Sequence, residues 1–280
     1  MLLLVVVFIY IVCSISNYMV MCMGQDKKTI YYKNELEDEF SAAQITPRII
    51  DGKYKYEGGI GFFLGKLFFY EILAKPIAYC FMKTKFGHKV IGRERLKKAR
   101  KEGYFLYGNH TNDIADALIP SLSCFPKDVS VIVHPNNVSM PILGRITPFL
   151  GALPLPDDKQ AVKNFNAAIK HKIEKKHCVT IYPEAHIWPY YTKIRPFPDT
   201  SFGYPIKHNC QVFCFTNTYQ KRRFFKSPRI VTYIDGPFCS DNSLPLKEQR
   251  AKLRNQVYDA MCRASLKNNV EMIQYIKIED

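Results

Sequence analysis

A histidine with two nearby carboxylates stands at a predicted corner between a strand and a helix. Residues 104–108 are an apolar, aromatic run that ends in glycine, and residues 114–118 are typical of a helix. Such a corner at a sheet edge can hold His110 at the mouth of a crevice, with Asp113 and Asp116 within reach. A neutral histidine oriented by a carboxylate acts as a general base near pH 7.

The residue types around this histidine narrow the chemistry. The sequence has no serine or cysteine in a nucleophile-elbow pattern such as G-x-S-x-G. His110 would therefore activate a hydroxyl group that belongs to the substrate. Transfer of an acyl group to an alcohol is a reaction of this kind.

Two further segments place polar residues after apolar runs. Residues 179–189 are a strand of the buried type that enters a loop with Glu184, His186 and the only tryptophan. Residues 141–154 place a proline and two glycines at fixed spacing around Arg145. The histidines and acids do not show metal-ligand spacing such as H-E-x-x-H, so we expect no metal and no cofactor.

At these three segments the chain resembles the lysophospholipid acyltransferase family, as a divergent bacterial-type relative of the 1-acyl-sn-glycerol-3-phosphate acyltransferases. The family's first motif is Asn-His, four residues and Asp; Asn109-His110 matches it, with Asp116 one residue later. The second motif, Pro-x2-Gly-x6-Gly, is matched by Pro141, Gly144 and Gly151. The third, Phe-Pro-Glu-Gly-Thr-Arg, stands against Tyr-Pro-Glu-Ala-His-Ile at residues 182–187. The resemblance covers roughly residues 92–237 in the same order.

The resemblance also fails at two positions. An arginine closes the second and third motifs of the family, and Asp157 and Ile187 stand there in this chain. Those arginines resemble phosphate clamps, because a guanidinium binds phosphate through two parallel hydrogen bonds. A glycerol-phosphate acceptor is therefore in doubt. Arg145, Lys193 and Arg195 are close enough in sequence to substitute.

Spacing alone leaves the carboxylate partner of His110 open between Asp113 and Asp116. The resemblance favours Asp116 as the second catalytic residue, with Asp113 as a cap of the following helix. Glu184 and Arg145 are expected to line the acceptor pocket. His186 could bind the acceptor, stack on Trp188 or bond Glu184. The full set expected to bind substrate is Asn109, Thr111, Asp113, Gly144, Arg145, Pro183, Glu184, Ala185, His186 and Arg195.

The composition favours a membrane over nucleic acid as the charged partner. The net charge is +15 over 280 residues, and its basic residues are spread in local clusters rather than in a recognisable nucleic-acid module. An anionic cytoplasmic leaflet attracts such surfaces. The nine cysteines are irregularly spaced, which indicates reduced thiols rather than a disulfide framework.

The first 91 residues are expected to form two segments with different surroundings. Residues 1–23 carry no charge and are long enough to span a membrane, although a start site set too far upstream is an equal alternative. Residues 24–91 are expected to be an extended arm followed by interfacial helices over 60–86, with a pair of core helices as the alternative. Either way the catalytic region should lie at the membrane, on its cytoplasmic face.

Residues 92–280 show alternating strand and helix patterns, which predict one α/β acyltransferase domain with a mixed sheet flanked by helices. The expected strands are 104–107, 129–133, 179–182, 211–216 and 229–234, and residues 246–266 are expected to form a terminal amphipathic helix.

These observations together predict a membrane-associated O-acyltransferase. Its donor, as the resemblance implies, would be a thioester of coenzyme A or of acyl carrier protein, and its acceptor a hydroxyl of a lyso-phospholipid or a similar lipid. Two alternatives come from other classes: a lipid or thioester hydrolase with the same histidine and aspartate, and a membrane-binding protein without catalytic activity.

Overall fold

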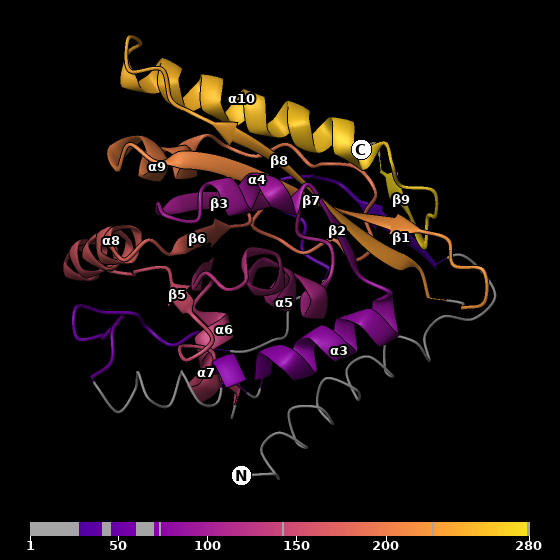
Figure 1. Cartoon of the computed structure of the whole chain (residues 1–280), viewed down its shortest axis with the longest axis horizontal. Coiled ribbons are helices and arrows are strands. Elements are labelled where there is room, and N and C mark those ends of the chain that lie inside the picture. Colours follow the sequence, from indigo (N-terminus) through magenta and orange to yellow (C-terminus); the bar gives the residue numbers. More distant parts are fainter. Residues whose placement is uncertain are drawn as a thin grey trace.

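The computed structural model describes residues 28–40, 46–59, 70–72, 74–141, 143–225 and 227–278. Within them, a seven-stranded sheet has the order β2-β8-β7-β3-β6-β4-β5 (Figure 1). Its strands are β2 (Lys89–Ile91), β3 (Tyr104–Gly108), β4 (Val129–Val133), β5 (Ala152–Pro154), β6 (Cys178–Ile181), β7 (Gln211–Gln220) and β8 (Arg229–Phe238). The five strands from β7 to β5 are parallel, and β8 runs antiparallel to β7.

Helices cover both faces of this sheet. One face carries α3 (Lys75–Phe86), α4 (Arg93–Lys98) and α5 (Asp113–Cys124), and the other carries α8 (Lys159–Glu174), α9 (Gly203–Lys207) and α10 (Leu246–Ser265). The short helices α6 (Asn136–Ser139) and α7 (Leu143–Ile146) lie between β4 and β5, and a 3-10 turn, η2 (Thr200–Phe202), precedes α9.

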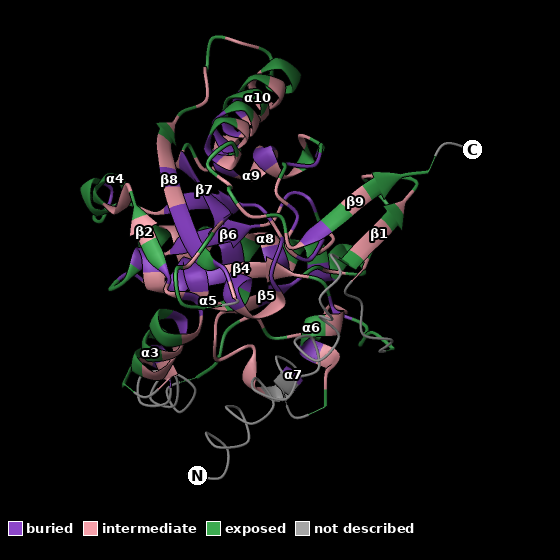
Figure 2. Cartoon of the chain, turned by 90° about the vertical axis from the view of Figure 1, so that its right-hand side faces the viewer, coloured by how far each residue is buried: buried purple, intermediate pink, exposed green. Residues whose placement is uncertain are grey.

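The central strand β3 is buried along its whole length because it has a core on each side. Tyr104 and Leu106 point into the core under α3, α4 and α5, while Phe105 and Tyr107 point into the core under α8 and α10. This alternation follows from the two-residue period of a strand. Figure 2 shows the same pattern, with buried residues in the central strands and exposed ones on the outer sides of the helices.

The expected α/β domain with a mixed sheet is confirmed. All five expected strands exist, and β7 and β8 extend further than expected because they pair with each other as a hairpin. The terminal helix forms as α10. The sequence did not indicate the short strands β2 and β5. β2 comes from the segment of residues 24–91, before the start of the expected acyltransferase domain, and it forms one edge of the central sheet.

A second, two-stranded sheet joins distant parts of the chain. β1 (Lys28–Tyr32) pairs in parallel with β9 (Ile273–Lys277). The Trp188 ring stacks on Tyr275 at 5.1 Å between centroids and meets the edge of Tyr32 at 4.8 Å. The early segment of the chain, residues 28–40 and 46–59, therefore contacts the loop that contains Glu184 and His186.

Only part of the expected interfacial segment lies within the described residues; residues 1–23 and 60–69 lie outside them. α3 packs Met82 and Phe86 into the core beside α5 and exposes Tyr79 on its other side. Pro76 lies in the first turn of α3, where a proline fits without a kink. Across the described residues, no helix is both long enough and apolar enough to cross a membrane.

Candidate active site

The corner after β3 is held by side-chain hydrogen bonds to the backbone. β3 ends at Gly108, and α5 begins at Asp113 with Asn112 as its N-cap. The side-chain oxygen of Asn112 accepts the N–H of Ala115 at 2.9 Å, which satisfies a donor that the helix start leaves unpaired. The expectation that Asp113 caps this helix is wrong, because Asp113 lies inside the first turn and Asn112 fills the cap position.

The carboxylate that contacts His110 belongs to Asp116, in the first turns of α5. Its Oδ2 lies 2.9 Å from Nδ1 of His110 and accepts the backbone N–H groups of Thr111 at 2.8 Å and Asn112 at 2.9 Å. A helix start stabilises a carboxylate through its free N–H groups and its dipole. Asp116 is 1% exposed and the His110 side chain 19% exposed, so the acid is shielded while the ring reaches the surface.

Asn217, in β7, supports the other oxygen of this carboxylate. Its side-chain amide donates to Oδ1 of Asp116 at 3.0 Å. The backbone of Asn217 and the side chain of Asn109 exchange two hydrogen bonds, of 2.8 and 3.1 Å. Asn109 is buried and its amide is committed to β7, so it ties the end of β3 to the neighbouring strand.

The hydrogen bonds continue from Asn217 to a second buried histidine. The hydroxyl of Thr232 donates to Oδ1 of Asn217 at 2.7 Å, and Nε2 of His88 lies 2.9 Å from the same hydroxyl oxygen. Because the Thr232 hydrogen is already used, Nε2 of His88 is the donor. Burial, with a smaller contribution from the charge of Lys83, lowers the pKa of His88 to about 4. His88 is therefore neutral at pH 7.

The contacts of His110 define its tautomer. A carboxylate only accepts, so the hydrogen of the neutral ring lies on Nδ1 and the lone pair on Nε2. Among the described residues, no hydrogen bond to Nε2 is found. The ring stacks on Tyr182 at 4.3 Å between centroids. The hydroxyls of Thr111 and Tyr219 lie 2.9 Å apart, and both side chains are buried.

The loop after β6 reaches this corner through Glu184. Its carboxylate accepts the N–H of His110 at 3.1 Å and the N–H of Arg195 at 3.1 Å, and it pairs with the Arg195 guanidinium at 3.3 Å. Burial raises the pKa of Glu184, and the charge of Arg195 acts against this. Both side chains are fully buried. These contacts give Glu184 a part in placing the backbone of His110.

Ala185 and His186, beside Glu184, stand where the family pattern has glycine and threonine. Ala185 adopts φ +63°, a left-handed conformation that favours glycine, which is the residue the family has there. Pro183 is buried. His186 is 31% exposed and pairs with Glu39 at 3.4 Å, so the early segment of the chain provides its charged partner.

The second motif lies between β4 and β5, and the groups around it form hydrogen bonds with backbone atoms. The N–H of Gly144 donates to the carbonyl of Met140 at 2.8 Å, and a Cβ at Gly144 would lie 2.5 Å from the Val138 carbonyl oxygen. Asp157 accepts the N–H of Ile50 at 2.6 Å. The acid at the expected arginine position thus anchors the early segment. The side chain of Arg145 lies outside the described part of the structure.

Comparison with known proteins finds a solved structure with the same fold. No protein-family model and no curated protein sequence matches the chain. Among solved structures, the 1-acyl-sn-glycerophosphate acyltransferase PlsC from Thermotoga maritima is similar, with a TM-score of 0.52 and 15% sequence identity, over 75% of this chain and 91% of that chain. The two proteins share a fold. The resemblance predicted from the three motifs is thus confirmed at the level of the fold.

Sequence reasoning missed the residues that complete the network around Asp116. Asn217 lies one residue beyond the end of the expected strand, and Thr232 and His88 come from elements on the other side of β7. The sequence contains a signal by which Asn217 could have been identified as part of the site. It is a polar residue in an otherwise buried strand, and a buried polar side chain must find hydrogen-bond partners.

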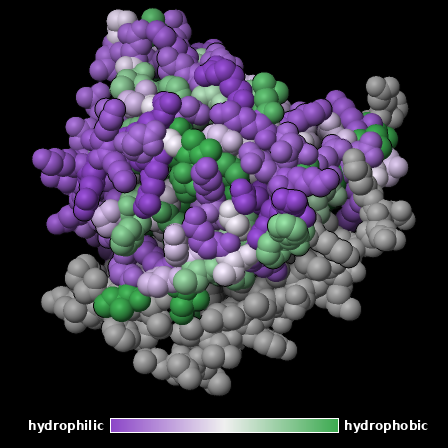
Figure 3. All heavy atoms as spheres, turned by 45° about the vertical axis from the view of Figure 1, so that its right-hand side comes forward, coloured by the Kyte–Doolittle hydropathy of each residue, from purple (hydrophilic) through white to green (hydrophobic). Residues whose placement is uncertain are grey.

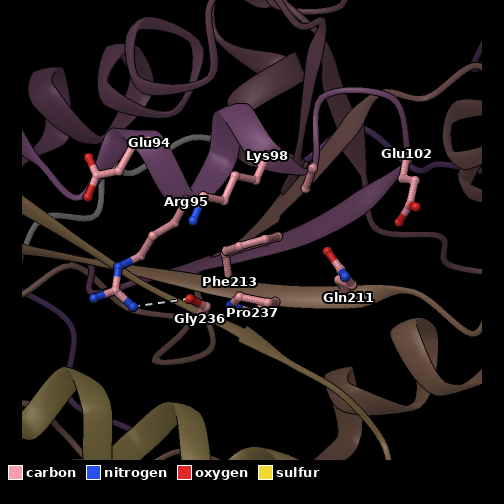
Figure 4. Close-up of a pocket in the computed structure, with 9 residues that line it drawn as sticks. Glu94, Arg95, Lys98, Glu102, Gln211, Phe213, Gly236 and Pro237 are labelled. Atoms are coloured by element: carbon pink, nitrogen blue, oxygen red, sulfur yellow. Dashed lines mark hydrogen bonds between the residues drawn. The ribbon is translucent and has the colours of Figure 1, made fainter.

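A surface pocket elsewhere on the molecule does not belong to this site. It has a volume of 410 Å³ and lies beside α4, where Arg95 donates to the carbonyl of Gly236 (Figure 4). Gln211, the first residue of β7, lines it, so it lies at the sheet edge opposite His110. In α/β enzymes, ligands bind at the carboxyl ends of the parallel strands instead. Within the described residues, no cluster of histidine, cysteine and acidic side chains could hold a metal ion.

Proposed function

We propose that the protein is an O-acyltransferase that moves an acyl chain from a thioester to a hydroxyl of a lyso-phospholipid or a similar lipid. The observation that carries this proposal is the pairing of His110 with Asp116, which leaves Nε2 with its lone pair at the carboxyl edge of β3. The fold shared with a lysophosphatidic acid acyltransferase supports it.

In the proposed reaction, His110 acts as the general base. Its Nε2 takes the proton of the acceptor hydroxyl while the hydroxyl oxygen attacks the thioester carbonyl carbon. The tetrahedral intermediate then collapses, the carbon–sulfur bond breaks, and the imidazolium returns the proton to the leaving thiolate. Asp116 stays ionised throughout, orienting the ring and stabilising its charged form. The acyl group passes directly to the acceptor.

The backbone amides at the corner are already engaged. The N–H groups of His110, Thr111 and Asn112 donate to Glu184 and Asp116, and that of Gly144 donates to Met140. The first three hold the two carboxylates and the fourth pairs with a backbone carbonyl, rather than with a developing oxyanion. In this arrangement the tetrahedral intermediate takes its donors from other groups at the same edge.

The donor and the location belong to the same proposal. A thioester of coenzyme A or acyl carrier protein supplies the acyl group, and an anionic phospholipid membrane, at its cytoplasmic face, supplies the acceptor. The net charge of +15 supports the membrane as partner.

The experiment that tests the reaction compares variants of the two acids near His110. Loss of a general base typically lowers the rate by about 100- to 10,000-fold. We therefore expect His110→Ala and Asp116→Asn to lose acyl transfer to this extent, and Asp113→Asn to retain most of it. The measurement is lipid mass spectrometry of the purified protein with acyl thioester and a panel of lyso-lipids. His171→Ala, at a histidine near the end of α8 whose side chain is 43% exposed and which lies away from the carboxyl edge of the sheet, is the matched control.

Circular dichroism and thermal unfolding of each variant separate a chemical effect from a folding defect. Acyl transfer by folded His110→Ala within a few-fold of the wild-type rate would overturn the mechanism. Release of free fatty acid at a rate that does not depend on the lyso-lipid would instead identify a hydrolase with the same two residues.

A further inference from the structure

The turn between β7 and β8 exposes two adjacent aromatic rings beside a run of basic residues. Phe224 is 82% exposed and Phe225 58% exposed, and Lys221, Arg222 and Arg223 precede them directly. Neighbouring large apolar side chains are rarely left in water on a soluble surface without a partner. The pairing of β7 with β8 ends at Gln220 and does not require them.

This turn lies beyond the same sheet edge as His110. β7 is parallel to β3, with Phe215 opposite Gly108, and Asn217 reaches Asp116. β7 then continues to Gln220, which places the start of the turn about 10 Å past Asn217 at the usual rise of a strand. Figure 1 shows the hairpin extending to the right of the sheet, beyond the end of α3.

The base of the turn is held in place while its tip is free of the core. The Arg222 guanidinium donates to the carbonyl of Lys85 at 2.8 Å and lies 3.7 Å from the centre of the Phe225 ring. The N–H of Lys221 donates to the side chain of Asn269 at 2.8 Å. Arg223 lies 5.2 Å from the centre of the Phe224 ring. The two rings are therefore presented to solvent by a fixed support.

The neighbouring helix adds exposed groups of the same kinds. Before and within α3, Ile72 and Tyr79 are exposed, and the Lys83 ammonium lies 5.6 Å from the centre of the Tyr79 ring. Arg222 joins this helix to the turn. The face seen in Figure 3 is mainly hydrophilic, with hydrophobic side chains in a few small groups. Exposed aromatic rings among basic groups match a layer with an apolar interior and anionic headgroups.

We propose that residues 221–225, supported by the end of α3, dock the protein on an anionic lipid surface. Phe224 and Phe225 enter the boundary between headgroups and acyl chains, and Arg223 contacts the lipid phosphates. Docking on vesicles can be measured independently of acyl transfer. The contribution of docking to acyl transfer rests on the proposed function, because docking turns the sheet edge that carries His110 toward a membrane-bound acceptor.

Vesicle binding by the full chain tests this proposal. We expect Phe224→Ser/Phe225→Ser to bind vesicles of phosphatidylcholine and phosphatidylglycerol about tenfold or more weakly than wild type, because the rings no longer leave water. The control is Val162→Ser/Leu246→Ser, which removes two exposed apolar side chains from α8 and the start of α10. Arg223→Gln should weaken binding roughly fivefold, the effect of one basic contact. Lys98→Gln, at an exposed position on α4, should not.

A fluorescence measurement reports where the tip goes. In Phe224→Trp, vesicles should shift the emission of the new indole to shorter wavelength, and brominated acyl chains should quench it. The buried Trp188 of the wild type supplies the baseline. Equal vesicle binding by the serine variant and its control, or an emission of the Phe224→Trp protein that vesicles leave unchanged, would overturn the proposal. If no variant transfers acyl groups but the binding differences remain, the docking surface stands and the proposed reaction falls.

Discussion

At the level of single residues, the site is a directed chain of hydrogen bonds between two histidines. It runs from His88 through Thr232 and Asn217 to Asp116 and ends at His110. Each link has one possible donor, because the carboxylate only accepts and the Thr232 hydrogen is used once. The side-chain nitrogen of Asn217 donates to Asp116, and its side-chain oxygen accepts the hydroxyl hydrogen of Thr232. Both bonds require the same orientation of the Asn217 amide. The chain therefore fixes both the side-chain flip of Asn217 and the tautomer of His110.

The neutral His88 makes stability depend on pH. Its pKa is about 4 in the folded protein, against 6.5 for an ordinary histidine. This difference corresponds to a change of about 3 kcal/mol in the free energy of unfolding between neutral and acidic pH. Since the folded pKa is the lower one, this contribution is complete above about pH 6.5 and is lost as the pH falls toward 4. We expect His88→Gln, which keeps a donor for Thr232, to unfold with a smaller dependence on pH between 7 and 4. Urea unfolding across this range measures it.

Burial also lowers the pKa of His208, with Lys207 and Lys170 adding to the effect, so the substitution at His88 should reduce the slope rather than remove it. His134→Gln, at an exposed histidine, is the control. A His88→Gln protein whose stability changes with pH as steeply as the wild type would contradict the assignment of His88 as a buried neutral group.

At the level of elements, the site depends on how closely β3 lies against β7. A Cβ at Gly108 would lie 2.1 Å from the ring of Phe215, the residue opposite it in β7. We expect Gly108→Ala to lower the free energy of unfolding by about 1–3 kcal/mol, the usual effect of overpacking a core. It should also lower the acyl transfer rate, because it displaces the two strands that carry Asn109 and Asn217. Chemical unfolding and rate measurements on the same protein test both effects.

Ala185→Gly is the matched opposite of this substitution. A left-handed residue with a Cβ is strained by about 1–2 kcal/mol, while glycine adds about 0.4–1 kcal/mol of unfolded-state entropy. At φ +63° the two effects leave the stability of Ala185→Gly unchanged or raised by up to about 1.5 kcal/mol. Marked destabilisation by Ala185→Gly would show that the loop is held differently.

The loop after β6 depends on a buried ion pair. Arg195 donates to Glu184, and also to the carbonyls of His186 and Glu35. Removing one partner of a buried pair leaves an uncompensated charge, so we expect Arg195→Met to destabilise by about 3–5 kcal/mol. Glu184→Gln/Arg195→Met should recover part of this loss. A double-mutant cycle of unfolding free energies measures the coupling, and additive effects of the two substitutions would refute it.

At the level of the whole molecule, segments from both ends of the chain close over the loop that would meet the acceptor. Trp188 donates to the carbonyl of Asp38, and its rings pack against β1 and β9. Asp157 holds Ile50. The positions at which the family carries phosphate-binding arginines are thus occupied by groups that anchor the early chain or, at Ile187, offer no donor.

This arrangement predicts the choice of acceptor. Charge-assisted hydrogen bonds are worth about 1.5–3 kcal/mol each, so without two clamping arginines lysophosphatidic acid should be a poorer acceptor than a neutral or zwitterionic lyso-lipid. Competition between these acceptors, followed by mass spectrometry, measures the preference. Arg195 is buried and paired with Glu184, so Arg145→Ala and Lys193→Ala test the two remaining candidates for the phosphate. Efficient use of lysophosphatidic acid by the wild type and by both variants would refute the prediction.

The sequence by itself determined the longer strands of the central sheet, the last helix and the centre of the site. Apolar runs and their periods located five strands and the last helix, because local patterning reflects burial on one or two faces. The corner with Asn109 and His110 could be recognised because its residues are contiguous. Tertiary structure decided everything that depends on neighbours in space: the edge strands β2 and β5, the pairing of β1 with β9, and the supports of Asp116 from β7 and β8. Strand order and hydrogen-bond partners join residues a hundred or more positions apart, as between Asp116 and Asn217. No local pattern encodes that separation, so Asp157 could be recognised as a missing arginine but not as the anchor of Ile50.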